Sequence, residues 1–361
     1  MTDIRNEMRL FSVLCAAAIA ASVVFYGCRT AERGAECRDP GCELAARAEA
    51  VRAWCVSRGF RDVKRTDAPT IGAVRLSYSD ITTNGAFGIS LWMETNRLSV
   101  AVGTGLSAKG REKEFDQFTM YANQGRRVWH WIRDDGSNVL VLWATMYDWR
   151  NVWDQPTNAV LQMVELGKSE YGRYLDALRA VQLGTKTPED AWRTGPQSER
   201  LLNFCGAAPD QDLSSLYQSL WDVLADKLPV KWDAKQWYPI TFDIGLGPQV
   251  THSSLSTNLT GFVRADRCYV ECFLARPWGK GDKRVRLAPL VSKYNQDRGD
   301  GRWWVVEGGE PCIRMVYPTP YVISEPTRFV NACRSSVAEF LRHDEEMRQL
   351  LEGDLKLEDG R

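Results

Sequence analysis

Apolar and polar residues alternate along several short stretches in the first half of the chain, a pattern typical of strands with one buried face. The alternation covers residues 74–79, 87–93 and, after a turn at Thr95 and Asn96, 98–102. Apolar residues with helical spacing predict a first helix at about 43–58 and a second at 113–124. A hairpin follows, with strands at 129–133 and 139–147, and an amphipathic helix from Val160 to Leu178 closes the unit.

The second half repeats this order of elements. The predicted helices, strands and hairpin fall at 213–227, 238–244, 262–273, 284–296, 303–306 and 312–317, and the closing helix carries a stripe from Val330 to Leu341. Isolated identities keep the same order, since Trp54, Asn123 and Pro156 correspond to Trp221, Asn295 and Pro326, at offsets between 167 and 172. Ordered matches of this kind indicate two copies of one unit.

The pattern therefore predicts an α+β protein with two tandem units, each with the order helix, three strands, helix, two strands, helix. We expect each unit to be an antiparallel sheet with helices on one face. The expected organisation is a leader at 1–28, a tether at 29–42, domains at 43–183 and 213–352, a linker at 184–212 and a polar tail at 353–361.

The N-terminal segment has the composition of an export signal. Residues 10–27 are apolar or small, Arg5 and Arg9 precede them, and Gly27 stands directly before Cys28. This resembles a bacterial lipoprotein signal, which implies that Cys28 is lipidated, although Phe25 and Tyr26 depart from that pattern. An uncleaved anchor and an ordinary secretory signal remain alternatives, and all three predict export and placement of the body outside the cytoplasm.

The ten cysteines suggest an oxidising compartment. Cys15 and Cys28 belong to the leader, which leaves an even number in the body. We expect a disulfide between Cys37 and Cys42 in the tether, and another from Cys268 or Cys272 to Cys312 or Cys333. Buried free thiols are the alternative, because cysteine also packs as a small apolar residue.

The order of elements and the Asn-Gln pairs that end both middle helices, Asn123-Gln124 and Asn295-Gln296, resemble the YbjN-like family, whose fold is that of type III secretion chaperones. The resemblance covers about residues 43–181 and 213–351. It implies a curved sheet, a binding or chaperone-like role, and neither cofactor nor catalytic residues. Members with a single copy form homodimers, which implies that the two copies here pair within one chain as a pseudo-dimer, so that the protein is a monomer.

Charge and motifs exclude several functions at the level of sequence. Lys and Arg together equal Asp and Glu at 46 each, so the excess of positive charge typical of nucleic-acid binders is absent. Gly103-Thr104-Gly105 has the outline of a phosphate loop but neither of the usual spacings. His130, His252 and His343 lie far apart, and Cys268 and Cys272 lack a second pair for zinc. We therefore predict no catalytic residues, no metal site and no cofactor.

Aromatic residues give the candidate binding surface. Residues 139–143 are apolar on both faces, which predicts that both faces of this strand are covered. Trp129, Trp131, Trp149 and Trp153 are candidate partner contacts, with burial in the core as the alternative. The predicted function is a non-enzymatic, membrane-anchored envelope lipoprotein that binds a protein or peptide as a chaperone or adaptor. An envelope hydrolase with a site between the units and a structural spacer are the alternatives.

Overall fold

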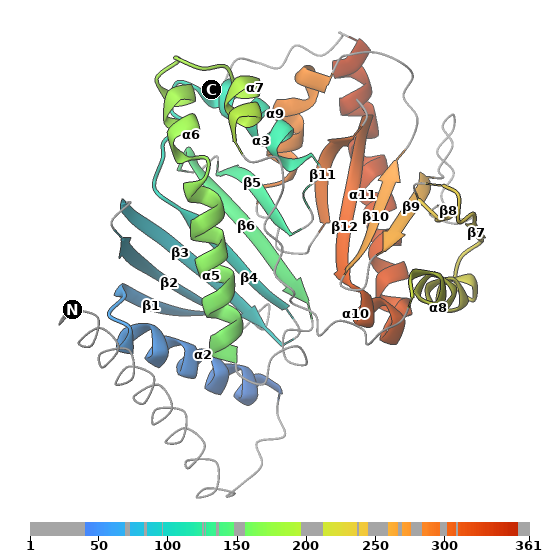
Figure 1. Ribbon diagram of the computed structural model, residues 1–361, viewed down its shortest axis with the longest axis horizontal. Coiled ribbons are helices and arrows are strands. Elements are labelled where there is room, and N and C mark those ends of the chain that lie inside the picture. The colour runs from blue at the N-terminus through green and yellow to red at the C-terminus, as the bar shows by residue number, and fades with distance from the viewer. Residues whose placement is uncertain are drawn as a thin grey trace, which may run out of the picture. The chain divides into compact units, whose positions relative to one another are not determined.

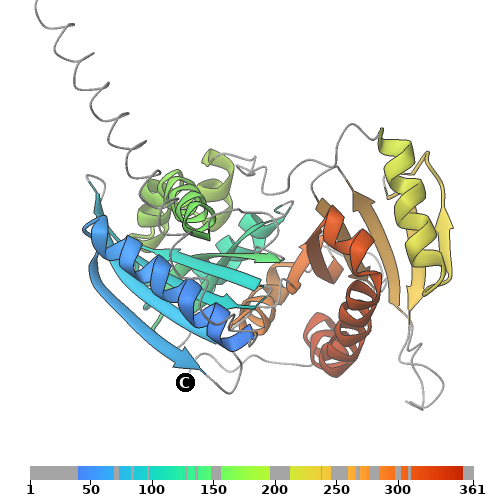
Figure 2. The same ribbon diagram turned by 90° about the horizontal axis from the view of Figure 1, so that it is seen from below.

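The structure is a computed structural model, in which the backbone is described for residues 40–68, 73–82, 85–95, 97–124, 126, 128–134, 137–147, 156–195, 212–236, 238–244, 259–265, 269–275, 284–296, 302–307 and 310–352. Within these residues the chain forms two antiparallel sheets of six strands each, together with helices (Figures 1 and 2). Both sheets belong to one compact unit, Leu44–Arg361.

The first copy contains a sheet with strand order β1-β2-β3-β4-β6-β5. Its elements are α2 (Pro40–Ser57), β1 (Arg61–Ala68), β2 (Ala73–Thr82), β3 (Gly85–Glu94), β4 (Arg97–Gly103), α3 (Glu112–Asn123), β5 (Trp129–Asp134), β6 (Val139–Tyr147), α5 (Pro156–Gly172) and α6 (Leu175–Gln182).

The second copy has the equivalent strand order, β7-β8-β9-β10-β12-β11. Its elements are α8 (Leu213–Ala225), β7 (Val230–Trp232), β8 (Ile240–Ile244), β9 (Leu259–Ala265), β10 (Tyr269–Ala275), α9 (Arg284–Tyr294), β11 (Arg302–Glu307), β12 (Glu310–Pro318), α10 (Thr319–Ser324) and α11 (Pro326–Glu352). The predicted α+β class with two tandem sheet units is confirmed.

Each copy has four strands before its middle helix, where the sequence predicted three. The missed strands are β1 and β7, and the segment predicted at 262–273 contains the two strands β9 and β10. β1 reads RDVKRTDA, and an edge strand this polar has no apolar alternation to reveal it. β7 is too short for a pattern, with three residues.

The predicted linker also contains a helix, α7 (Pro188–Thr194). Thr187 caps it, because its side-chain oxygen accepts a hydrogen bond from the backbone N–H of Asp190. Ala191 is buried, and the Trp192 ring stacks on Tyr121 of α3 with centroids 5.9 Å apart. These contacts fix α7 against the first copy.

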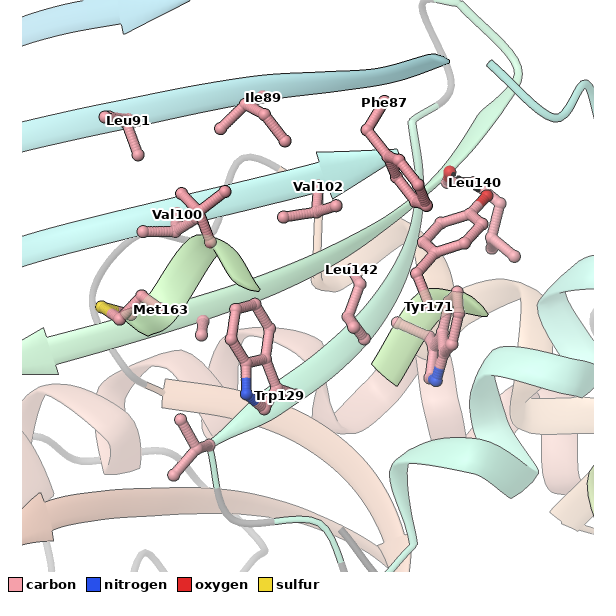
Figure 3. Packing of buried hydrophobic residues seen from close by; sticks show 14 of the residues in the cluster. Phe87, Ile89, Leu91, Val100, Val102, Trp129, Leu140, Leu142, Met163 and Tyr171 are labelled. Carbon is pink, nitrogen blue, oxygen red and sulfur yellow. Dashed lines mark hydrogen bonds between the residues drawn. The ribbon is translucent and has the colours of Figure 1, made fainter. Parts of the chain in front are cut away.

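One face of the first sheet is covered by helices and forms the core of that copy. Figure 1 shows α2 and α5 lying on this face. Alternate residues of β3 and β4 point toward the helices, among them Phe87, Ile89, Leu91, Val100 and Val102, which Figure 3 shows beside Trp129 and Tyr171. Strand alternation of this kind leaves the other set of side chains on the opposite face of the sheet.

The middle helix of each copy is joined to the edge strand by one asparagine. Asn123, at the end of α3, donates from Nδ2 to the backbone oxygen of Trp131 at 2.9 Å and accepts at Oδ1 from the backbone N–H of Trp131 at 2.7 Å. Asn295, just after α9, makes the same two bonds to Trp304 at 2.7 and 2.8 Å. We call this pair of bonds the asparagine clamp. It occupies backbone groups of β5 and β11, which are edge strands of their sheets.

Substitution Asn123→Ala should lower the free energy of unfolding by about 2–4 kcal/mol, because it leaves two buried backbone groups of Trp131 without partners. Urea denaturation of the full-length chain measures this loss. Gln124→Ala, one residue further on, is the control and should cost less than about 0.5 kcal/mol. Equal losses for the two variants would mean that the clamp adds nothing to stability.

Candidate functional site

The face of the first sheet opposite α2 and α5 carries a half-exposed group of aromatic and polar side chains, which we call the open face. The rings of Trp92 on β3 and Trp143 on β6 are stacked, with centroids 4.5 Å apart and 29° between their planes. The exposed Arg75 of β2 lies with its guanidinium 4.8 Å from the centre of the Trp92 ring. The three side chains form a continuous cation–π and stacking series across the sheet.

Hydroxyl groups hold the aromatic pair in place. Thr145 Oγ1 accepts a hydrogen bond from Trp143 Nε1 at 3.2 Å and is 3.1 Å from the hydroxyl of Ser99. Arg75 Nη2 donates to the hydroxyl of Ser90 at 3.4 Å. The Trp143 ring is therefore oriented by Thr145 of its own strand, and Thr145 is in turn held by Ser99 of β4.

The register identifies the equivalent positions in the second copy. Trp92 of β3 is paired across the strands with Ser99 of β4. The equivalent cross-strand pair in the second copy is Arg264 of β9 with Glu271 of β10. Trp143 of β6 is paired with His130, which precedes the clamped Trp131. Arg314 of β12 is paired with Trp303, which precedes the clamped Trp304, so Arg314 corresponds to Trp143. Positions that hold aromatic and hydroxyl groups in the first copy thus hold charges in the second.

These charges form an ionic cluster with a buried centre, and Arg264 at its margin is half-exposed. Arg314 and Glu271 are almost fully buried and are ion-paired, with Arg314 Nε donating to Glu271 at 2.7 Å. Arg264 forms a further ion pair with Glu271. Arg314 also lies 4.8 Å from the centre of the Phe273 ring and donates from Nη1 to the backbone oxygen of Asn123 at 3.3 Å. A buried charge needs such compensation, so this cluster has a structural role.

The two copies make contact through equivalent elements. His130 of β5 and Trp303 of β11 precede the two clamped tryptophans, and their rings stack with centroids 4.4 Å apart and 11° between planes. The equivalent helices α3 and α9 contact each other, as do β6 and β12. A small apolar cluster contains residues of both copies: Ile132, Val141, Trp143, Tyr238, Phe262, Phe273, Ala275, Trp303, Val305 and Cys312.

His130 is fully buried at this junction. Both of its ring nitrogens are buried, and the backbone of Val128 lies near enough to favour the charged form of the ring, an effect that burial outweighs. Burial, and secondarily the positive charges of Arg314 and Arg126, lower the pKa of His130 well below its usual range. The imidazole is neutral in the folded protein, with Arg314 compensated by Glu271 and Arg126 by Glu170.

The prediction that Trp129 and Trp131 contact a partner is wrong. Both rings are buried in the core of the first copy, on the face that the helices cover. Trp131 packs against Phe118, Tyr171 and Tyr174. Strand alternation placed both rings on one face, but it gave no sign of which face the helices cover. Trp149 and Trp153 lie outside the described residues.

The structure has Cys272, Cys312 and Cys333 as buried free thiols, in contrast to the predicted disulfide, and Cys268 lies outside the described residues. The thiols of Cys272 and Cys333 are hydrogen-bonded to each other, and burial raises the pKa of Cys272 well above its usual value. The thiol of Cys272 is therefore unreactive in this environment, because the reactive form is the thiolate.

The predicted lipidation and tether residues cannot be located in the fold. Cys28 and Cys37 lie outside the described residues, and Cys42 is in the first turn of α2, where its side chain is not described. None of the described helices is sufficiently long and apolar to span a membrane. Within the described residues, no group of three or more His, Cys, Asp or Glu side chains is arranged to bind a metal ion.

Comparison of the chain with protein-family models, curated proteins and solved structures found no match. The open face therefore has to be interpreted from its own chemistry. Sequence analysis missed Trp92, Trp143 and Arg75 as a group, although the alternation of Arg75, Ser77 and Ser79 marked one polar face. The missing information was the register, which brings residues of β2, β3 and β6 together.

Acid should destabilise the protein through His130. Below about pH 6.5 the unfolded chain binds a proton at this residue that the folded chain does not, so stability falls as pH decreases. The maximum contribution of one such group is about 1.4 kcal/mol per pH unit. His130→Phe keeps a ring against Trp303 and should flatten the dependence of unfolding free energy on pH between 6.5 and 5. An unchanged slope would show that His130 is not the responsible group.

Proposed function

We propose that the protein is a non-enzymatic binding protein of the bacterial envelope, and that it captures a protein or peptide on the open face of its first copy. The difference between the two copies carries this proposal. At equivalent positions the second copy has an ionic cluster in which Arg314 and Glu271 are buried, whereas the first has Trp92 and Trp143, which are half-exposed beside the exposed Arg75. Aromatic rings and arginine are the side chains that contribute most to binding in protein interfaces.

The edges of both sheets are unfavourable for adding a partner strand, which supports use of a face. β1 is charged and has a register shift between Arg61 and Lys64, with Asp62 at a φ of 56°. β7 has three residues. At the other edges, the clamps already occupy backbone groups of Trp131 and Trp304.

Pairing of the two copies within the chain is part of the proposal. When equivalent surfaces meet about a twofold axis, each residue near the axis contacts its own counterpart. The stacking of His130 on Trp303 and the contacts of α3 with α9 and of β6 with β12 have this character. We infer that the chain is a monomer with an internal pseudo-dimer, as the resemblance to YbjN-like proteins implies.

Attachment to the membrane through a lipid on Cys28 completes the proposed role. The apolar segment at 10–27 and the Gly27-Cys28 pair support it. A short tether would keep the open face near the membrane surface, where exported or envelope proteins are available as partners.

A photo-crosslinking amino acid at Ser77 tests the binding face in intact cells. Ser77 is half-buried on the open face of β2, and Thr241 is its half-buried equivalent on β8. We expect a covalent protein adduct from position 77 and little from position 241. The proposal would be wrong if both positions gave equal adducts, or if neither gave one.

Metabolic labelling with a palmitate analogue tests the anchor. The wild-type chain should be labelled, whereas Cys28→Ser should lose the label and remain attached to its uncleaved leader, because lipidation requires that thiol. Cys15→Ser, which changes another leader cysteine, is the control and should be labelled normally. Equal labelling of Cys28→Ser and wild type would exclude lipidation at this residue.

A further inference from the structure

Positive charge gathers on the open face at its β1 edge. Cross-strand partners share one face of a sheet, and Lys64 of β1 is paired with Ser77, which alternates with core residues Leu76 and Tyr78. The register shift in β1 brings Arg61 opposite Ser79 on the same face. With Arg75, three exposed cations therefore lie on the open face.

Among the described residues of β1 and β2 near these cations, Asp62 lies between Arg61 and Lys64 in the chain, so the three cations outnumber the one carboxylate there. Glu94, at the end of β3, is ion-paired with Arg97. Asp134 is at the tip of the β5–β6 hairpin, where its carboxylate accepts a hydrogen bond from Ser137. The ion pair of Arg65 with Asp67 lies on the other face, because Arg65 also reaches Glu49 of α2. The chain is neutral overall, but this face has a positive field that attracts anionic partners.

The side chains along one row of the open face differ in size. The register places Lys64, Ser77, Ser90, Ala101 and Trp143 side by side on β1, β2, β3, β4 and β6. Small side chains occupy the middle of this row and long ones its two ends. Four strand spacings of about 4.8 Å make the row about 19 Å long. An extended peptide rises about 3.4 Å per residue, so about six residues fit across it.

We propose that the partner of the open face is an acidic, extended peptide segment of about six residues, which lies across the strands between the basic edge and the Trp92–Trp143 pair. This inference rests on the proposed function and adds the chemistry of the partner. Carboxylates of the segment pair with Lys64, Arg61 and Arg75, and its apolar groups contact the tryptophan rings.

A peptide fits this surface better than a lipid bilayer does. A peripheral protein binds a bilayer by inserting apolar side chains that project from its surface. Here Ser77 and Ser90 are half-exposed, Ala101 is buried, and the two tryptophan rings are only half-exposed. An extended chain can lie over Ser77 and Ser90 and reach both the cations and the rings, without inserting a large apolar group.

Fluorescence anisotropy tests the proposal with the full-length protein in detergent. The probes are a labelled peptide with six consecutive glutamates and a matched peptide with six glutamines. Wild-type protein should bind the glutamate peptide roughly tenfold more tightly than the glutamine peptide, with an affinity that falls as salt increases. Lys64→Glu should remove most of this preference, and Arg75→Gln should weaken it.

Lys231→Glu is the matched control. Lys231 is the exposed residue of β7 opposite Thr241, and so is the equivalent of Lys64 in the second copy. The Lys231→Glu substitution should leave binding of the glutamate peptide unchanged. All variants are compared by circular dichroism, so that loss of fold is separated from loss of binding.

Equal affinity for the two peptides would overturn the proposal, as would an equal loss of glutamate-peptide binding in Lys64→Glu and Lys231→Glu. Lys64-dependent binding to phosphatidylglycerol vesicles or to duplex DNA that is tighter than binding to the peptide would also overturn it. Crosslinking at Ser77 distinguishes failure of the binding function from failure of the acidic-peptide proposal. If a protein adduct forms there while the glutamate peptide fails to bind, the binding function stands and its acidic partner does not.

Discussion

The asparagine clamp is the interaction on which the rest of each copy depends. An edge strand leaves alternate backbone groups without a neighbouring strand, and a helix that packs beside it leaves carbonyl groups unsatisfied at its end. Asn123 and Asn295 provide hydrogen-bond partners for the edge strands, since each bonds both backbone groups of one tryptophan. By fixing the helix to the strand, the clamp also sets which face of β5 and β11 carries the large rings. Trp131 and Trp304 then fill the two cores, and His130 and Trp303 are turned toward each other.

A buried arginine of the second copy is bonded to the backbone of the first copy. Arg314 donates to the backbone oxygen of Asn123, at the negative end of helix α3. Its charge is also compensated by Glu271, so the cluster of the second copy is joined to the end of α3, at the clamp of the first copy. The equivalent positions of the first copy form no ionic cluster and hold Trp92, Ser99 and Trp143 instead, of which Trp143 also packs against the apolar cluster between the copies. In our account one copy stabilises the pair and the other provides the binding surface.

Sequence patterns predicted the longer helices and the central strands, because these elements bury one face and therefore show a clear period, whereas the short helices α7 and α10 were missed. The alternation at 87–93 and 98–102 corresponds to β3 and β4, and the Asn-Gln matches between copies marked both clamps. Edge strands β1 and β7 were missed because polar or very short strands carry no such period. The binding surface was misassigned to Trp129 and Trp131 for a related reason. Alternation separates the two faces of a strand, but covering helices decide which face is core, and their docking depends on contacts distant in sequence.

Hydroxyl-radical footprinting of the tryptophans, in intact cells and in purified protein, shows whether a partner covers the open face. We predict that Trp92 and Trp143 are modified in the purified protein and protected in cells, where the partner is present. The buried rings of Trp129, Trp131, Trp303 and Trp304 should be protected in both states. Equal modification of Trp92 and Trp143 in cells and in purified protein would contradict a partner on the open face.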